Sequence, residues 1–279
     1  MVGIGFATIT GRTAITGSSA LVEDVVSKAP SPIIGDLSRR LREQSSPLRI
    51  FVGYDETEHA AWEVCRYSLM KHATVSLDIQ PLKQLELRRL GLYRRAPNRN
   101  GVDCFDGLPF STDFTFTRFL VPHLCMYDGW ALFCDCDFMF RADVSELFAL
   151  ADSSRAILCV HHDHKPIETV KMTGQKQTLY PRKNWSSLVL WNCGHPVHKK
   201  LTVDSVNLEA GRWLHNFEGI RDTGLIGEIQ EEWNWLEGYS SPAIYPKAVH
   251  FTRGGPWMDQ WRDVAYADEW MKLFSEIAA

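Results

Sequence analysis

The chain lacks the features that define several protein classes. None of its apolar runs approaches the roughly 20 residues that a helix needs to cross a bilayer, so we expect at most a peripheral contact with a membrane. It also lacks the basic excess of nucleic-acid-binding proteins, because 30 Lys and Arg residues stand against 34 Asp and Glu residues, a formal net charge of −4. We therefore expect no nucleic-acid partner.

Cysteine spacings of disulfide frameworks and zinc sites are absent as well. The seven cysteines are an odd number, and the nearest pair, Cys134 and Cys136, is neither a zinc spacing nor matched by a second pair. The first residues do not show the charged start and apolar core of a secretory signal. Reduced thiols without a signal predict a cytoplasmic protein.

The N-terminal segment differs in composition from the rest. Residues 1–47 are rich in Gly, Ser, Thr and Ala and end with a basic run, Arg39-Arg40-Leu41-Arg42. We expect a poorly ordered extension there, with a basic contact to a membrane surface as the minor alternative. A compact domain is expected over 48–279, a length that suits one α/β domain.

That domain alternates strand-like and helix-like segments. Strands are expected at 48–54, 76–82, 130–140, 156–160, 187–191 and at the end of 242–251. Helices are expected around 61–69, 115–127 with a kink at Pro122, 144–151, 197–208 and 263–278, and a short basic helix or loop at 85–92. The alternation predicts an α/β fold whose central sheet is mostly parallel and is flanked by helices. Ligands bind such sheets beyond the carboxyl ends of the strands.

Two carboxylates stand out at one of those ends. Asp135 and Asp137 lie two residues apart in an apolar run, so in a strand they would point to the same side. Like charges on one side of a buried strand need a neutralising partner, and a divalent cation suits carboxylate oxygens. A solvated turn is the alternative, but the apolar flanks argue against it. The pair predicts chemistry on a phosphorylated substrate.

A second cluster lies near the C-terminus, at His250–Trp257. His250 follows an apolar run and is a candidate third metal ligand, since imidazole binds transition metals well. Gly254 and Gly255 would let backbone amides approach a phosphate, and Arg253 would supply charge. The alternative is a loop with a hydrogen-bonded histidine and a glycine turn.

The order of these motifs resembles that of glycosyltransferases with the GT-A nucleotide-sugar-binding fold, and most of all glycosyltransferase family 8. Ile50–Asp55 resembles the first strand and nucleotide turn of that family. Phe116–Pro122, followed by Leu132–Asp137, resembles its arginine helix and Asp-x-Asp strand. His250–Trp257 resembles its closing loop.

The resemblance implies a metal-dependent hexosyltransferase that moves a sugar from a nucleoside diphosphate sugar, a UDP-sugar above all, to a hydroxyl acceptor with retention. It implies Mn²⁺ as the cofactor, with Mg²⁺ as the second candidate, and Asp135, Asp137 and His250 as the metal ligands. The acceptor would be a carbohydrate, a lipid-linked sugar or a small molecule. The implied donor-binding residues are Val52, Tyr54, Asp55, Arg118, Asp135, Asn192, Arg253, Gly254 and Gly255.

The chain also departs from the family pattern, and this leaves the catalytic residue unassigned. Gln230 matches the family's glutamine, but Ile229 stands where an aspartate is expected. An inverting displacement would instead need a carboxylate base, for which Asp222, Glu228 or Glu231 are candidates.

Two alternative hypotheses about the function of the chain remain. One is an aspartyl-nucleophile phosphatase or phosphomutase, although such enzymes usually carry the aspartate pair on their first strand. The other is a non-catalytic nucleotide- or carbohydrate-binding protein. Arg118 also has the alternative of a surface helix arginine, and Asn192 that of a polar turn residue.

Overall fold

The computed structural model describes residues 46–96, 102–108, 110, 112–163, 182–220 and 222–278. The expected extension lies outside the described residues up to position 45, and so does its basic run. Within the described part, no helix combines the length and the apolar character needed to cross a bilayer.

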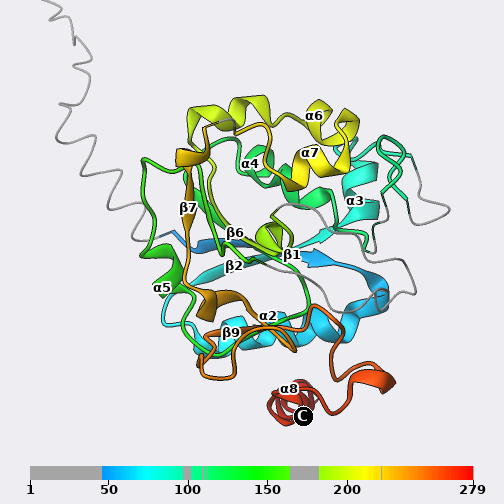
Figure 1. The fold of residues 1–279 in the computed structure, drawn as a ribbon, viewed down its shortest axis with the longest axis vertical. Helices are drawn as coiled ribbons and strands as arrows, with labels where there is room; N and C mark the ends of the chain where they lie inside the picture. Colours follow the sequence, from blue (N-terminus) through cyan, green and yellow to red (C-terminus); the bar gives the residue numbers. More distant parts are fainter. Residues whose placement is uncertain are drawn as a thin grey trace, which may run out of the picture. The chain divides into compact units, whose positions relative to one another are not determined.

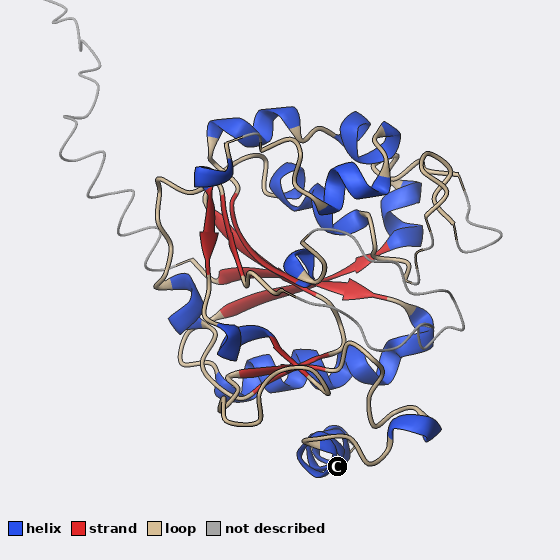
Figure 2. Cartoon of the chain, in the orientation of Figure 1, coloured by secondary structure: helices blue, strands red, loops and turns tan. Residues whose placement is uncertain are grey.

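A six-stranded sheet forms the centre of the fold, in the order β2-β1-β3-β6-β5-β7 (Figures 1 and 2). Five of these strands run in one direction, and β6 is antiparallel to both of its neighbours, β3 and β5. The expected mostly parallel sheet is confirmed. The strands are β1 (Leu48–Tyr54), β2 (Leu77–Lys83), β3 (Trp130–Cys134), β5 (Ile157–Cys159), β6 (Leu188–Asn192) and β7 (Ile226–Glu228).

A small second sheet lies beside the first, in the order β4-β9-β8. Its strands are β4 (Phe138–Phe140), β8 (Trp235–Leu236) and β9 (Ala248–His250). It brings the C-terminal part of the chain against the segment that follows β3, because β4 pairs antiparallel with β9.

Helices cover both faces of the central sheet. In Figures 1 and 2, α4, α6 and α7 lie over one face, and α2 with the small sheet lies over the other. The α-helices are α2 (His59–His72), α3 (Gln84–Arg89), α4 (Val121–Leu124), α5 (Ser145–Phe148), α6 (Val203–Leu208), α7 (Gly211–His215) and α8 (Ala267–Ile277). The 3₁₀ helices are η1 (Glu56–Glu58), η2 (Thr117–Leu120), η3 (Trp185–Ser187), η4 (Pro196–Lys200), η5 (Thr223–Leu225), η6 (Glu231–Asn234) and η7 (Asp259–Trp261).

Local sequence explains how β1 passes into α2. β1 is apolar and buried at its centre, and Asp55 ends it by accepting a hydrogen bond from the backbone N–H of Thr57 at the start of η1. The α2 positions expected to face the core are all buried: Ala61, Val64, Cys65, Ser68 and Leu69. Helical periodicity therefore predicted this interface correctly.

Other expected elements are wrong in extent. The helix expected over 115–127 consists of η2 and the single turn α4, because Pro122 cannot donate within a longer helix. The helix expected over 197–208 is divided into η4 and α6. The run 130–140, expected as one strand, is two strands in different sheets.

Candidate metal and donor site

The acidic pair lies in the turn that joins the two sheets. Asp135 follows β3, and its N–H still donates to the Ser187 carbonyl at 2.9 Å, whereas the Asp137 carbonyl accepts from the Phe251 N–H at 2.9 Å. The expectation of one continuous strand is therefore wrong, whereas the expectation that the two carboxylates lie on the same side is confirmed. A tight turn held by two distant segments brings the carboxylates together instead.

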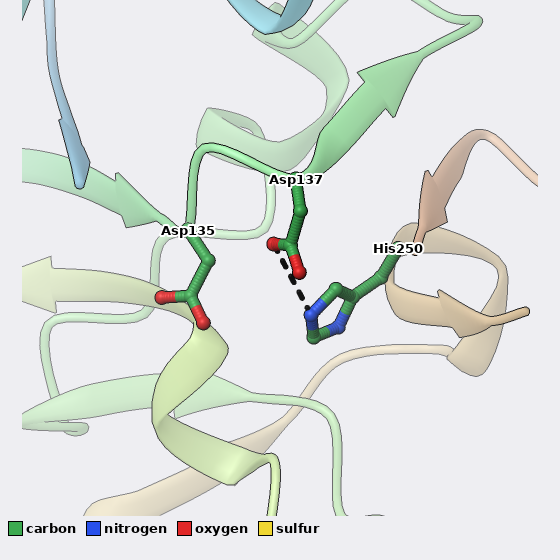
Figure 3. Close-up of side chains that lie close together, drawn as sticks. All are labelled: Asp135, Asp137 and His250. Atoms are coloured by element: carbon green, nitrogen blue, oxygen red, sulfur yellow. Dashed lines mark ion pairs between the residues drawn. The ribbon is translucent and has the colours of Figure 1, made fainter. Parts of the chain in front are cut away.

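The third member of the cluster comes from β9. His250 pairs with Phe138 of β4, and its Nε2 lies 3.4 Å from Asp137 Oδ1. One ligand atom from each of Asp135, Asp137 and His250 lies within 4.8 Å of the others. Figure 3 shows the three side chains, which come from the turn after β3 and from β9.

The electrostatics of this cluster are dominated by burial. Burial raises the pKa of Asp135 to about 7, against the opposing effect of the Arg118 guanidinium, and the neighbouring Asp137 carboxylate raises it further. The two carboxylates of Asp135 and Asp137 thus lie close together and away from water, and this arrangement favours binding of a cation.

Sequence reasoning missed a third buried carboxyl, Glu58. Burial raises its pKa to about 8, and Asp137 is the next contributor in the same direction. Its Oε2 accepts a hydrogen bond from the Cys136 thiol at 3.2 Å. A signal was present, because Glu58 closes the acidic run that follows β1, at the sheet edge where ligands were expected.

The donor atoms fit a divalent cation. Asp137 Oδ1 is buried and accepts no hydrogen bond from the part of the chain that the structure describes, and His250 Nε2 lies 3.4 Å from it. Asp135 Oδ1 already has the Arg118 guanidinium 2.8 Å away. A buried carboxylate oxygen without a donor is costly unless a cation contacts it. Two carboxylates with one imidazole are a suitable ligand set for Mn²⁺.

Arg118 is buried against the same cluster, so the alternative of a surface arginine is wrong. It lies on η2, and its Nη1 donates to the Ser186 carbonyl at 2.8 Å and lies 2.8 Å from Asp135 Oδ1. The guanidinium also lies over the Phe114 and Phe133 rings. Its position is therefore determined by the core and by the carbonyl of Ser186 in η3.

The predicted nucleotide residues lie at the carboxyl end of β1, next to the end of β3. Val52 is fully buried and is paired with Cys134, while Tyr54 is half-buried with its hydroxyl 3.2 Å from His59 Nδ1. The Asp55 carboxylate accepts from Thr57 and from the Asp113 N–H, at 3.1 Å in the second case. These side chains share the sheet edge with the acidic pair.

The closing loop has a different internal arrangement from the one expected. Arg253 forms an ion pair with the buried carboxylate of Glu237, with Nη2 2.7 Å from Oε2. Gly254 has a φ of +121°, and its N–H donates to the Phe251 carbonyl. A Cβ on Gly255 would lie 2.0 Å from the Trp257 ring. Each of these three residues thus takes part in packing or local bonding, and their contact with a diphosphate stays a prediction.

Asn192 and Asp222 lie at the amino ends of the parallel strands, whereas Asp135 lies at their carboxyl ends. Asn192 is beside Trp130, at the amino end of β3, and its amide donates to the Arg155 carbonyl. Asp222 precedes β7 and accepts from the Gly224 N–H. The structure does not bring either residue to the acidic pair.

The remaining catalytic candidates lie at the carboxyl ends of the parallel strands, as Asp135 does. Glu228 ends β7, and Gln230 follows it at the start of η6, and both are exposed. Because β7 runs in the same direction as β3, its carboxyl end opens onto the edge that carries Asp135. Glu231 accepts a hydrogen bond from the Ser240 hydroxyl.

No family model matches the chain. The chain is 48% identical over 238 residues to Protein CDI of Arabidopsis thaliana. The aligned region covers 84% of this chain and 88% of that protein.

Among solved structures, the chain is similar to the WbbM bifunctional glycosyltransferase, with a TM-score of 0.53 and 17% identity over 82% of this chain and 50% of that chain. It is also similar to the galactosyltransferase LgtC in complex with donor and acceptor sugar analogues, with a TM-score of 0.51 and 12% identity over 82% of this chain and 96% of that chain. The chain thus spans half the length of WbbM. These similarities show a GT-A-like fold shared with glycosyltransferases.

Proposed function

Because this chain belongs to the family of Protein CDI and has a GT-A-like fold, we propose that it is a metal-dependent glycosyltransferase. It would transfer a hexose from a UDP-sugar to a hydroxyl group of a carbohydrate, lipid-linked or small-molecule acceptor. The observation that carries this proposal is the convergence of Asp135, Asp137 and His250 at the carboxyl edge of the sheet.

These three residues would hold Mn²⁺, with Mg²⁺ as the second candidate. The imidazole favours Mn²⁺, since Mg²⁺ prefers oxygen ligands alone. When bound, the cation stabilises the negative charge that develops on the departing nucleoside diphosphate. Arg118 keeps Asp135 available as a carboxylate, because its guanidinium lowers the pKa that burial raises.

The nucleotide would lie along the end of β1. Tyr54 offers an aromatic ring for the base, and Asp55 offers carboxylate oxygens for the ribose hydroxyls. Glu237 already balances the charge of Arg253. We therefore assign neutralisation of the diphosphate chiefly to the metal.

For the sugar-transfer step we propose retention, with Gln230 near the anomeric carbon. Gln230 is exposed at the edge where the donor would lie, and it has no charge that would make it a general base. Glu228, on the same edge, is the candidate base for an inverting reaction. The configuration of the product distinguishes the two.

The decisive experiment is a screen of nucleotide sugars for Mn²⁺-dependent hydrolysis, together with calorimetry of UDP binding with and without a chelator. Asp137→Asn should abolish metal-dependent binding. Asp128→Asn is a matched control, because Asp128 is an exposed aspartate just before the other end of β3. UDP affinity that is equal with and without Mn²⁺ would contradict the proposal.

Binding and turnover measurements also distinguish the two alternative functions, a non-catalytic binding protein and a phosphatase. Metal-dependent UDP binding without turnover of any donor would indicate a non-catalytic binding protein. Release of inorganic phosphate from a simple phosphomonoester, blocked by substitution of Asp135, would indicate a phosphatase.

A further inference from the structure

We propose that Asn234 is a positioning residue that holds His250 in the tautomer whose Nε2 lone pair faces Asp135 and Asp137. The inference rests on the proposed function, since it concerns the metal site of that function. It adds a residue that neither the motif order nor the acidic cluster contains.

Contacts on two sides determine how the His250 ring lies. Its Nδ1 is 2.9 Å from Asn234 Oδ1, and its face stacks on Phe138 with the ring centroids 4.4 Å apart and the planes 17° apart. Asn234 is fully buried and His250 almost so. The stack sets the plane of the imidazole and the amide sets its rotation, so Nε2 is directed at Asp137.

The direction of the hydrogen bonds follows from a fixed acceptor. The Asn234 amide also contacts the Asn184 carbonyl at 3.4 Å and the Ser187 hydroxyl oxygen at 2.9 Å. A carbonyl can only accept, and the Ser187 hydroxyl already donates to that same carbonyl at 2.7 Å. The amide nitrogen must therefore face Ser187 and Asn184, because an amide oxygen there would meet two acceptors.

The orientation of the amide then assigns the proton on the histidine. With its nitrogen towards Ser187, Asn234 presents Oδ1 to His250, and an oxygen can only accept. Nδ1 of His250 must carry the hydrogen. In the neutral ring this leaves the lone pair on Nε2, the atom that belongs to the ligand cluster.

Ser187 links this chain of hydrogen bonds to the first ligand. Its hydroxyl orients Asn234, while its backbone carbonyl accepts from the Asp135 N–H at 2.9 Å. The end of η3 therefore positions one ligand through the backbone and another through a side-chain relay.

An amide suits this position better than a carboxylate. Asp135, Asp137 and Glu58 already bring three acidic groups into one buried region. A further carboxylate would orient the imidazole equally well but would add another buried negative charge in the metal-free protein. Asn234 provides the acceptor without the charge.

The test uses two variants and a control. Asn234→Leu removes the acceptor, and Asn234→Asp keeps it. Asn207→Leu is the control, because Asn207 is also buried and donates to the Leu92 and Val203 carbonyls away from the acidic cluster. The first readout is nitrogen NMR of the metal-free protein with labelled histidine over a series of pH values, with His250→Gln used to assign the signal.

We expect the Nδ1–H tautomer in the wild type and in Asn234→Asp, and a mixture or the Nε2–H tautomer in Asn234→Leu. The second readout is Mn²⁺ affinity by calorimetry. It should fall about 10- to 100-fold in Asn234→Leu, and change only a few-fold in Asn234→Asp and in the control.

Several results would overturn the inference. An Nε2–H tautomer in the metal-free wild type would do so even if Asn234→Leu does not fold. Equal Mn²⁺ affinity in the wild type and Asn234→Leu would remove the positioning role but leave the proposed function intact. A wild-type chain with the Nδ1–H tautomer but no Mn²⁺ binding would overturn the metal-dependent function, and with it the role assigned to Asn234.

Discussion

The guanidinium of Arg118 lies 2.8 Å from Oδ1 of Asp135, and only 6% and 14% of the two side chains are exposed. The contact joins η2 to the turn after β3, two segments that sheet pairing alone would not hold together. A buried ion pair contributes little net stability, but loss of one partner leaves a charge without compensation.

We therefore expect Arg118→Met to destabilise the metal-free protein by about 3–5 kcal/mol, because Asp135 would remain buried without its cation. Urea denaturation measures this. Arg118→Lys should recover part of the loss, since one ammonium group replaces a fork that contacts both Asp135 and the Ser186 carbonyl. A loss below about 1 kcal/mol in Arg118→Met would show that Asp135 is neutralised in another way.

The second prediction concerns Arg253 and Glu237. Arg253→Met should lower the free energy of unfolding by about 2 kcal/mol, because Glu237 is buried and loses its ion partner. Adding Glu237→Gln should restore much of that stability. The double variant should bind UDP within a few-fold of the wild type. A much larger loss of UDP than of uridine affinity in the double variant would instead assign Arg253 to the diphosphate.

The third prediction is a pH dependence that comes from His198. Burial lowers the pKa of His198 from 6.5 to about 4, and its Nε2 donates to the Ala156 carbonyl at 2.9 Å. The unfolded chain binds a proton at a higher pH than the folded one, so this contribution is fully present above pH 6.5 and is lost as the pH falls towards 4.

When the pH is lowered between those limits, the free energy of unfolding should fall by about 3 kcal/mol less in His198→Gln than in the wild type. Glutamine keeps a hydrogen-bond donor but does not titrate. Denaturation at a series of pH values measures the difference. His123→Gln is the control, since His123 lies on α4 and is not among the groups that shift the pKa of His198. Parallel pH profiles for wild type and His198→Gln would contradict the assignment.

The fourth prediction concerns the end of β1. A Cβ on Gly53 would lie 2.5 Å from the Phe114 ring, so Gly53→Ala should cost about 1–3 kcal/mol through overpacking next to Tyr54. Phe114→Leu in the same chain should relieve the contact. The double variant should therefore be more stable than the sum of the two single changes implies. Additive losses would show that the cost of Gly53→Ala does not come from its contact with Phe114.

Much of the fold followed from local pattern. The buried face of α2 and the positions of β1 and β2 were predictable, because apolar periodicity and turn residues act over a few positions. Pro122 likewise marks where the helix expected over 115–127 is interrupted, but the direction of β6 was not predictable. Strand direction depends on which edge of a neighbour is free, and that is decided only when distant segments pair.

For the candidate site, the residue types alone were enough to predict a cation between Asp135 and Asp137, with His250 as a third ligand. Tertiary structure decided how these residues meet: a turn between two sheets brings the aspartates together, and β9 delivers a histidine more than a hundred positions away. It also placed Asn192 beside Trp130, at the amino end of β3, and paired Arg253 with Glu237. The physical reason is that a side chain's chemistry is local, whereas its burial, its partners and its proton positions depend on groups remote in sequence.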